Sequence, residues 1–371
     1  MMKLKYTCFL LFAGMMSACE SDPTPTPTPE TPLVEVEGGF DFSLFSIPDQ
    51  LCTPRPSVEA LNVYRFLKEN FGKKLISGAM ANVNWNFEES AWIFEQTGKY
   101  PVINCLDYIH HIYSPADWID YEKISEAEFW WKKNGLIAGM WHWNVPSNDG
   151  EDFAFYYGSA PRETSFPPSA IANPDSEEYR LLLSDLDQVA GYLKLLRDKN
   201  IPVLWRPLHE AAGNTNSYAG GKAWFWWGGE GPEPYIALWR AMYERFVNYH
   251  GLNNLIWIWT SDGNDPEWYP GDRYVDIVSC DLYVEKDPHN AQSGTFDKLA
   301  ALTGWKKIIA LSECGGIPDP DFCFAEGAMW SWYMPWYNDY TRLDQYNGAT
   351  YFKKLMNSPH VITRDQMPNL K

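Results

Sequence analysis

Short apolar runs alternate along the chain with longer amphipathic segments. Runs rich in β-branched and aromatic residues that end in polar residues predict eight strands, at 74–78, 101–107, 136–142, 202–206, 254–259, 276–280, 307–311 and 327–332. Apolar residues follow one another in these runs instead of alternating with polar ones. Such a pattern is typical of a parallel sheet, which is covered on both faces.

Segments with helical spacing separate the predicted strands, for example 56–69, 176–199 and 233–249. The second has apolar residues three and four apart, at Leu182, Leu186, Val189, Leu193 and Leu196. This spacing predicts one buried helix face. Eight units of strand then helix predict a (β/α)8 TIM barrel, an α/β fold with its site at the carboxyl ends of the strands. A doubly wound open sheet is the alternative, but no glycine-rich phosphate loop follows the first strand.

The first 39 residues have a different pattern from the rest. Two lysines and an apolar run at 6–16 predict a signal peptide over residues 1–18. The sequence before Cys19 resembles a bacterial lipobox, so we expect Cys19 to be lipidated; an ordinary secretory signal is the alternative. The Pro-Thr repeat within 19–39 predicts an extended tether, which leaves 40–371 as a single catalytic domain. A bacterial lipoprotein of the outer membrane is expected, attached to the membrane only through this lipid.

Aromatic residues are unusually frequent, with 19 Trp, 22 Tyr and 19 Phe making up 16% of the chain. Aromatic rings stack on the apolar faces of sugar rings and also on nucleic-acid bases. A formal net charge of −18 repels a phosphate backbone and so argues against nucleic acid as the partner. The composition therefore favours a neutral polymer of rings.

Seven cysteines are present, of which Cys8 lies in the predicted signal and Cys19 is the predicted lipid site. The other five lack C-x-x-C spacing, which argues against a zinc site and against a disulfide framework. One or two bridges remain open, and Cys314 with Cys323 is the closest pair in sequence. His209 and Glu210 begin an H-E-x-x-H pattern that Gly213 breaks, so no metal or other cofactor is expected.

Two predicted strands are followed by a glutamate, Glu210 after the fourth and Glu313 after the seventh. Strands on opposite sides of an eight-stranded barrel can direct side chains to one point. Retaining glycosidases need two carboxyl groups roughly 5–5.5 Å apart, one as acid/base and one as nucleophile. The pair therefore predicts glycoside hydrolysis.

The segments around these glutamates resemble those of glycoside hydrolase family 26, whose members are mainly β-mannanases. The resemblance rests on Trp205–Glu210 (WRPLHE) followed by Trp224–Trp227 (WFWW), and then on WHWN at 141–144, DLY at 281–283 and LSE at 311–313. It covers nearly everything from residue 40 to about residue 357. The resemblance implies a retaining barrel enzyme in which Glu210 is the acid/base and Glu313 is the nucleophile.

The resemblance also implies roles for supporting residues. His209 is expected near the nucleophile and the −1 sugar, Tyr283 is expected to orient Glu313, and Arg206 is expected beneath the site, where it keeps Glu313 ionised. Polar contacts to the −1 sugar are implied for His142 and Asn144, the leaving-group side for Trp224, and the platform under the −1 ring for Trp336 or Trp332. A longer turn than the family pattern, with an insertion at 214–221, leaves the position of Trp224 open.

These observations predict an endo-β-1,4-mannanase that acts on mannan, galactomannan or glucomannan by double displacement. An exo-acting mannobiohydrolase and a β-glucanase or xylanase of the same family remain open. A surface glycan-binding lipoprotein without catalysis is the alternative from another class. The presence of both Glu210 and Glu313 argues against that alternative.

Overall fold

A computed structural model of the chain describes residues 38–82, 85–214 and 222–371. The predicted signal peptide, Cys19, the Pro-Thr tether as far as residue 37, and residues 215–221 of the predicted insertion at 214–221 lie outside the described residues. The described residues from 38 onward belong to one compact unit, and the description below concerns that unit.

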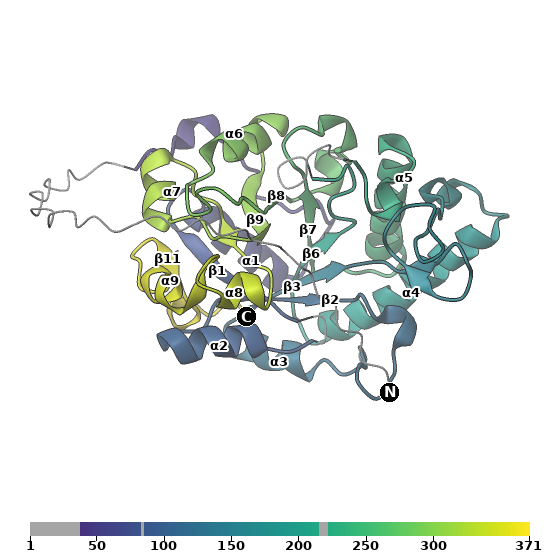
Figure 1. The fold of residues 1–371 in the computed structure, drawn as a ribbon, viewed down its shortest axis with the longest axis horizontal. Helices are drawn as coiled ribbons and strands as arrows, with labels where there is room; N and C mark the ends of the chain where they lie inside the picture. Colours follow the sequence, from purple (N-terminus) through teal and green to yellow (C-terminus); the bar gives the residue numbers. More distant parts are fainter. Residues whose placement is uncertain (1–37, 83–84, 215–221) are drawn as a thin grey trace, which may run out of the picture. The chain divides into compact units, whose positions relative to one another are not determined.

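A parallel sheet forms the centre of this unit (Figure 1). Its described strands are β1 (Leu75–Met80), β2 (Ile103–Asp107), β3 (Leu136–Trp141), β6 (Val203–Pro207), β7 (Leu255–Thr260), β8 (Ile277–Leu282), β9 (Ile308–Cys314) and β10 (Trp332–Tyr333). They pair in the order β10-β1-β2-β3-β6-β7-β8-β9, and the short β11 (Val361–Ile362) also pairs with β1. Consecutive strands of the barrel are therefore neighbours in space, as the alternation of elements predicted.

Hydrogen bonds between β9 and the segment around β10 join the two ends of this strand order. The amide of Ser331 donates to the carbonyl of Ile309 (2.8 Å), and that of Cys314 donates to the carbonyl of Met334 (3.0 Å). The predicted (β/α)8 barrel is thereby confirmed, and the open doubly wound alternative is wrong.

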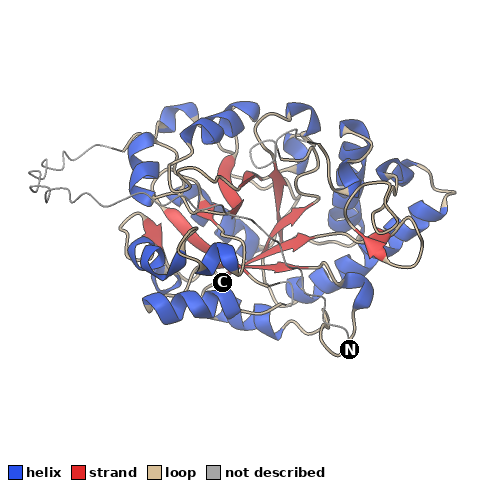
Figure 2. Ribbon diagram, in the orientation of Figure 1, coloured by secondary structure: helices blue, strands red, loops and turns tan. Residues whose placement is uncertain are grey.

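Helices surround the strands (Figure 2). They are α1 (Val58–Asn70), α2 (Glu88–Thr97), α3 (Ser125–Lys132), α4 (Glu177–Arg197), α5 (Pro232–Tyr243), α6 (Ser293–Leu302), α7 (Pro320–Glu326), α8 (Asp339–Arg342) and α9 (Gly348–Leu355). Serine hydroxyls cap α1 and α4, where Ser57 and Ser176 accept from the amides of Ala60 and Tyr179. Among the residues that the structure describes, no helix is both long and apolar enough to span a membrane.

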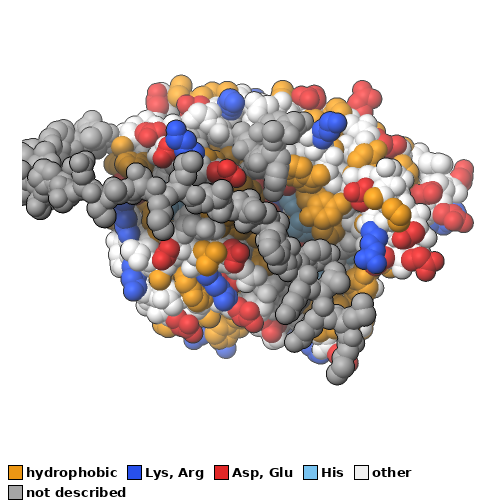
Figure 3. Space-filling model, in the orientation of Figure 1, with side chains coloured by type: hydrophobic (Ala, Val, Ile, Leu, Met, Phe, Trp, Pro, Cys, Tyr) orange, Lys and Arg blue, Asp and Glu red, His pale blue; other side chains and the backbone are white. Residues whose placement is uncertain are grey.

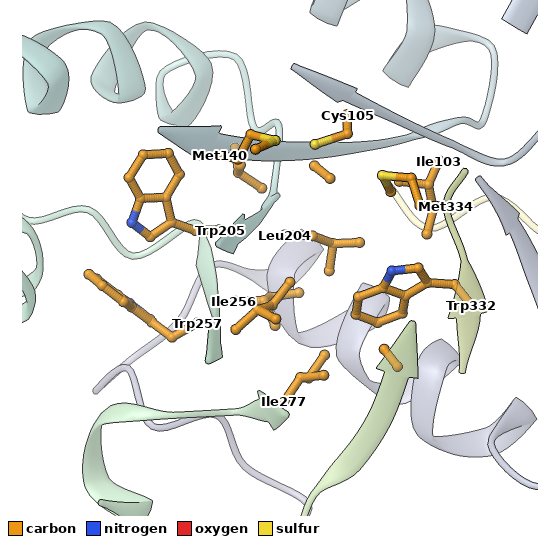
Figure 4. Close-up of a cluster of buried hydrophobic side chains, with 14 of the residues drawn as sticks. Ile103, Cys105, Met140, Leu204, Trp205, Ile256, Trp257, Ile277, Trp332 and Met334 are labelled. Carbon is orange, nitrogen blue, oxygen red and sulfur yellow. The ribbon is translucent and has the colours of Figure 1, made fainter. Parts of the chain in front are cut away.

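The apolar faces of these helices pack on the outside of the sheet, and a second set of apolar side chains fills the inside. In α4, all five predicted leucine and valine positions are buried. Inside the barrel, Ile103, Leu204, Ile256 and Trp332 converge from different strands (Figure 4). The barrel is therefore a packed core that leaves its carboxyl end for a site.

Two details of the sequence interpretation need correction. The predicted eighth strand at 327–332 is wrong, because the strand covers only Trp332–Tyr333 and α7 occupies the preceding segment. Gly327 ends α7 with a φ of 76°, a left-handed conformation that an extended strand does not contain. No disulfide forms among the five described cysteines, all of which are free, so Cys314 and Cys323 are not bridged.

Candidate active site

A cavity of about 390 Å³ is lined by residues that follow the carboxyl ends of the barrel strands. The lining residues are His142, Tyr156, His209, Glu210, Trp224, Phe225, Tyr283, Glu313, Trp336 and Tyr340. Histidine side chains lie beside hydrophobic ones near the middle of the face in Figure 3. The structure thus brings five of the predicted substrate-binding residues and both glutamates to one cavity.

Glu313 is held at the floor of this cavity by two hydrogen bonds from opposite sides. The buried guanidinium of Arg206 donates to its Oε1, and the hydroxyl of Tyr283 donates to its Oε2 over 2.8 Å. A carboxylate whose two oxygens both accept fixed donors has little rotational freedom. One of the two glutamates is therefore pre-oriented.

Asp281 shares the guanidinium of Arg206 with Glu313. Arg206 Nη1 donates to Asp281 Oδ2 (3.0 Å), and the Ser312 hydroxyl donates to Asp281 Oδ1 (2.7 Å). A bulge after Cys280 shifts the pairing of β8 and β9, so that Asp281 lies opposite Glu313. Burial raises the pKa of Asp281 to about 7, with a further contribution from the charge of Glu313, while Arg206 opposes the rise. Two carboxyl groups therefore depend on one cation.

Glu210 has a different environment from Glu313, although it lines the same cavity. Its Oε1 accepts a hydrogen bond from the side-chain amide of Asn214 (2.8 Å), and no ion pair to it is found among the described residues. Burial raises the pKa of Glu210 well above its ordinary value, and the charges of Asp281 and Glu313 raise it further. Of the two glutamates, Glu210 is therefore the one whose surroundings favour the protonated form.

The backbone around Glu210 adopts a conformation that is unusual for residues with a side chain. Leu208 and Glu210 have φ values of 49° and 50°, in the left-handed region. Hydrogen bonds hold this turn: Tyr235 donates to the carbonyl of Leu208 (3.3 Å) and the indole of Trp227 donates to that of His209 (2.9 Å). Strain of this kind persists at functional sites because the surrounding structure enforces it.

Two histidines form part of the same wall. The rings of His142 and His209 meet edge to face with centroids 4.6 Å apart, and His142 Nδ1 lies 2.6 Å from Asp107 Oδ2. Burial lowers the pKa of His209 well below its ordinary value, and the nearby cation Arg206 adds to this effect. His209 is therefore neutral, and its buried Nδ1 has no hydrogen-bond partner among the described residues.

Two of the sequence-predicted site residues lie elsewhere. Trp332 is buried in the barrel core among Ile103, Leu204 and Ile256, and Trp336 is the tryptophan that reaches the cavity. Asn144 is also absent from the lining, and its side-chain amide donates to the carbonyl of Ile109 (2.7 Å). Of the alternatives for the platform, the structure therefore places Trp336 and not Trp332 at the site.

Several residues at the site were not singled out from the sequence. Asp107 entered the prediction only as the last residue of the strand at 101–107, and Asp281 only as part of the DLY segment after the predicted strand at 276–280, although both contact predicted site residues. Asn214 and Tyr156 lie outside the named helices and strands, and Tyr340 lies on the four-residue helix α8, so no periodic pattern indicates which of these side chains face a cavity. The position directly at a strand end was the available signal for the two aspartates.

The fold and the site define a class. The carboxyl end of this (β/α)8 barrel holds two glutamates in an aromatic cavity, one whose pKa is raised and one oriented by hydrogen bonds. These are the features of a barrel glycoside hydrolase. The sequence profile of glycosyl hydrolase family 26 matches residues 52–366, and the chain belongs to this family.

Similar proteins agree with this assignment. A mannan endo-1,4-β-mannosidase of Thermothelomyces thermophilus is 35% identical over 323 residues, which cover 85% of this chain and 63% of that protein. The crystal structure of a β-mannanase from a symbiotic protist of the termite Reticulitermes speratus, complexed with gluco-manno-oligosaccharide, is 34% identical with a TM-score of 0.79 and covers 88% of this chain and 99% of that one. That of the Podospora anserina GH26-CBM35 β-(1,4)-mannanase is 33% identical with a TM-score of 0.76, covering 92% and 72% of the two chains. The chain spans 50–63% of the length of three curated relatives that it matches.

Proposed function

We propose that the protein is a retaining endo-β-1,4-mannanase that hydrolyses mannan, galactomannan or glucomannan. The observation that carries this proposal is the placement of Glu210 and Glu313 in one cavity with opposite environments. The mannanase names of the similar proteins support the choice of polymer.

In the first step, the carboxylate of Glu313 attacks the anomeric carbon while Glu210 donates its proton to the departing glycosidic oxygen. The C–O bond to the leaving chain breaks as the bond to Glu313 forms. The donors of Arg206 and Tyr283 orient Glu313 for this attack, and the raised pKa of Glu210 favours the protonated form that this step requires.

In the second step, Glu210 is ionised and removes a proton from water, which attacks the anomeric carbon and releases Glu313. Two inversions at the same carbon give net retention. The aromatic side chains of Trp336 and Trp224 offer apolar faces for the sugar rings on the cavity wall.

The test is product analysis on mannan, glucomannan, lichenan and xylan in parallel, with NMR detection of the first anomer released. We expect β-anomers and a series of long manno-oligosaccharides early in the reaction. Mannobiose alone from the start would replace the endo proposal with exo action. Faster cleavage of lichenan or xylan would show that mannan is not the preferred substrate. An α-anomer as first product would refute retention.

The same assay distinguishes a non-catalytic glycan-binding protein. Binding of mannan in affinity electrophoresis without any reducing-sugar release by the wild-type protein would refute the enzyme proposal. Glu95→Gln, an exposed substitution on α2, is the matched control for every glutamate variant because it changes the same atoms far from the cavity.

We also propose that Cys19 carries the lipid that attaches the protein to a bacterial outer membrane. This rests on the sequence before Cys19 alone. Cells that express the full chain should incorporate labelled palmitate into the protein, and Cys19→Ala should abolish that label. Equal labelling of the variant would refute the anchor.

A further inference from the structure

The side chain of Asp107, the last residue of β2, makes three hydrogen bonds, two through Oδ1 and one through Oδ2. Its Oδ1 accepts from two backbone amides, those of Ile109 (3.0 Å) and His142 (3.1 Å). Its Oδ2 lies 2.6 Å from Nδ1 of the His142 ring. Both residues are buried, at 4% and 7% exposure.

This geometry determines which atom of His142 faces the cavity. Because Nδ1 is directed at Asp107, Nε2 is the ring nitrogen left for the cavity that His142 lines. No hydrogen bond to Nε2 is found within the described parts of the chain. The rings of His209, Phe155 and Phe225 pack around the imidazole, with centroids 4.6 to 5.7 Å away.

We propose that Asp107 is a positioning residue that keeps a proton on His142 Nδ1, so that Nε2 presents a lone pair to the cavity and accepts a sugar hydroxyl. An ionised carboxylate can only accept, so the nitrogen that faces it must carry the hydrogen. In the neutral ring the other nitrogen then has none, and His142 selects a hydroxyl that donates. The sugar as partner rests on the proposed function, whereas the tautomer of the free protein does not.

The neighbouring imidazole is that of His209, 4.6 Å away between ring centroids. Burial lowers the pKa of His209 well below its ordinary value, and the charges of Arg206 and His142 add to this effect. The wall of the cavity next to the sugar then contains an acceptor at His142, which complements hydroxyl groups without adding a charge.

The substitution Asp107→Asn reverses this arrangement with little change in shape. Asn can keep an oxygen at the Oδ1 position, where two backbone amides demand an acceptor. Its NH2 group must then face His142 Nδ1 and donate to it. The His142 ring must then carry its proton on Nε2. Its Nε2 therefore presents a hydrogen-bond donor to the cavity in place of an acceptor.

NMR of the free protein tests the tautomer directly. In 15N-histidine-labelled protein, with His142→Gln used to assign the signals, we expect a protonated Nδ1 and an unprotonated Nε2 for His142 near neutral pH. Asp107→Asn should exchange the two. A wild-type ring protonated at Nε2, or at both nitrogens, would overturn the proposal, and so would an unchanged pattern in Asp107→Asn.

Kinetics test the consequence for the sugar. We expect Asp107→Asn to lower kcat/KM on mannan by about 10- to 100-fold, as expected when a buried polar group meets the wrong partner. In a His142→Ala background the same substitution should have little further effect, because the two residues act as one unit. Equal losses in both backgrounds would mean that Asp107 supports the fold only, and would overturn the proposal.

Two controls keep these outcomes separate. The melting temperature of Asp107→Asn reports any loss of folded protein, and kcat/KM is normalised to the folded fraction. If the wild type does not cleave mannan while the NMR pattern is as expected, the proposed function fails and the positioning role of Asp107 stands.

Discussion

Buried ionisable groups occur at both ends of the barrel strands, but their hydrogen-bond partners differ between the two ends. At the amino ends, the two oxygens of Asp276 accept from the backbone amides of Cys52 (2.6 Å) and Trp257 (2.8 Å). The ammonium of Lys307 donates to the backbone carbonyl of Val275 (2.6 Å). Asp276 and Lys307 therefore both form hydrogen bonds with backbone groups, whose positions are fixed by the fold.

At the carboxyl ends, carboxyl groups outnumber cations. Glu313 and Asp281 share the single guanidinium of Arg206, and Glu210 lies close enough for both charges to raise its pKa. These groups line or adjoin the cavity of the candidate active site, whereas the two oxygens of Asp276 accept from backbone amides.

This difference shows how burial affects ionisable side chains at each end of the barrel. A buried carboxylate that accepts from fixed backbone donors adds rigidity to the fold. Buried carboxyl groups that compete for one cation repel one another, and the repulsion separates their protonation states. The first arrangement closes one end of the barrel, and the second prepares the other end for acid–base chemistry.

The largest expected effect is that of Glu313→Gln, which removes the proposed nucleophile while keeping the shape of the side chain. We expect kcat on mannan to fall by roughly 10⁴-fold or more. The measurement is reducing-sugar release, with Glu95→Gln as the matched control. Activity within tenfold of the wild type would remove Glu313 from the mechanism.

Glu210→Gln should follow, with a loss of about 10²–10⁴-fold, the usual contribution of a general acid–base residue. The raised pKa of Glu210 also predicts a pH effect. The first step requires the protonated acid, so kcat/KM of the wild type should fall as pH rises through that pKa. The variant should lose this alkaline limb, and an unchanged limb would assign it to another group.

Tyr283→Phe deletes only the hydroxyl that donates to Glu313 Oε2. A hydrogen bond to a charged group contributes about 1.5–3 kcal/mol, so kcat should fall by about 10- to 100-fold. Tyr249→Phe, at an exposed tyrosine, is the control and should leave kcat unchanged. A change in KM alone would show that Tyr283 contacts the sugar and does not orient Glu313.

Asp276→Asn tests the opposite end of the barrel. The amide NH2 would face a backbone N–H, leaving a buried donor without a partner, and we expect the free energy of unfolding to fall by about 1–3 kcal/mol. Urea denaturation measures this, with the exposed Asp297→Asn as control. Activity per folded molecule should stay at the wild-type level. A loss of kcat without a loss of stability would contradict the view that the amino ends of the strands serve stability and the carboxyl ends serve catalysis.

The smallest expected effect is a gain in stability from Glu210→Gln at neutral pH. The pKa of Glu210 is raised in the folded state above its unfolded value of about 4.5, so the folded state holds the proton more tightly. Stability is therefore lost as pH rises from the unfolded value through the folded pKa. Thermal unfolding at several pH values should show no stability advantage of the variant below about pH 4.5 and an advantage that grows as pH rises from there toward the folded pKa.

Much of the barrel could be predicted because its strands are continuous apolar runs that end in polar residues. Seven of the predicted strands overlap observed ones closely, whereas the eighth, at 327–332, was displaced. The segment contains apolar residues whether it is a strand or a turn after a helix, and only packing decides between them. The same displacement explains why Trp332 and Trp336 could not be distinguished: two tryptophans on one irregular segment give no local sign of which faces the cavity.

The sequence by itself determined the alternation of elements, the family and the pair of glutamates, because periodicity and short motifs are local properties. Only the tertiary structure decided that Arg206 bridges Asp281 and Glu313, that Glu210 lacks an ion pair among the described residues, and that Asp107 bonds His142. These contacts join strands far apart in the chain. Their protonation states follow from burial and from distances between charges, and both of these exist only once the barrel has closed.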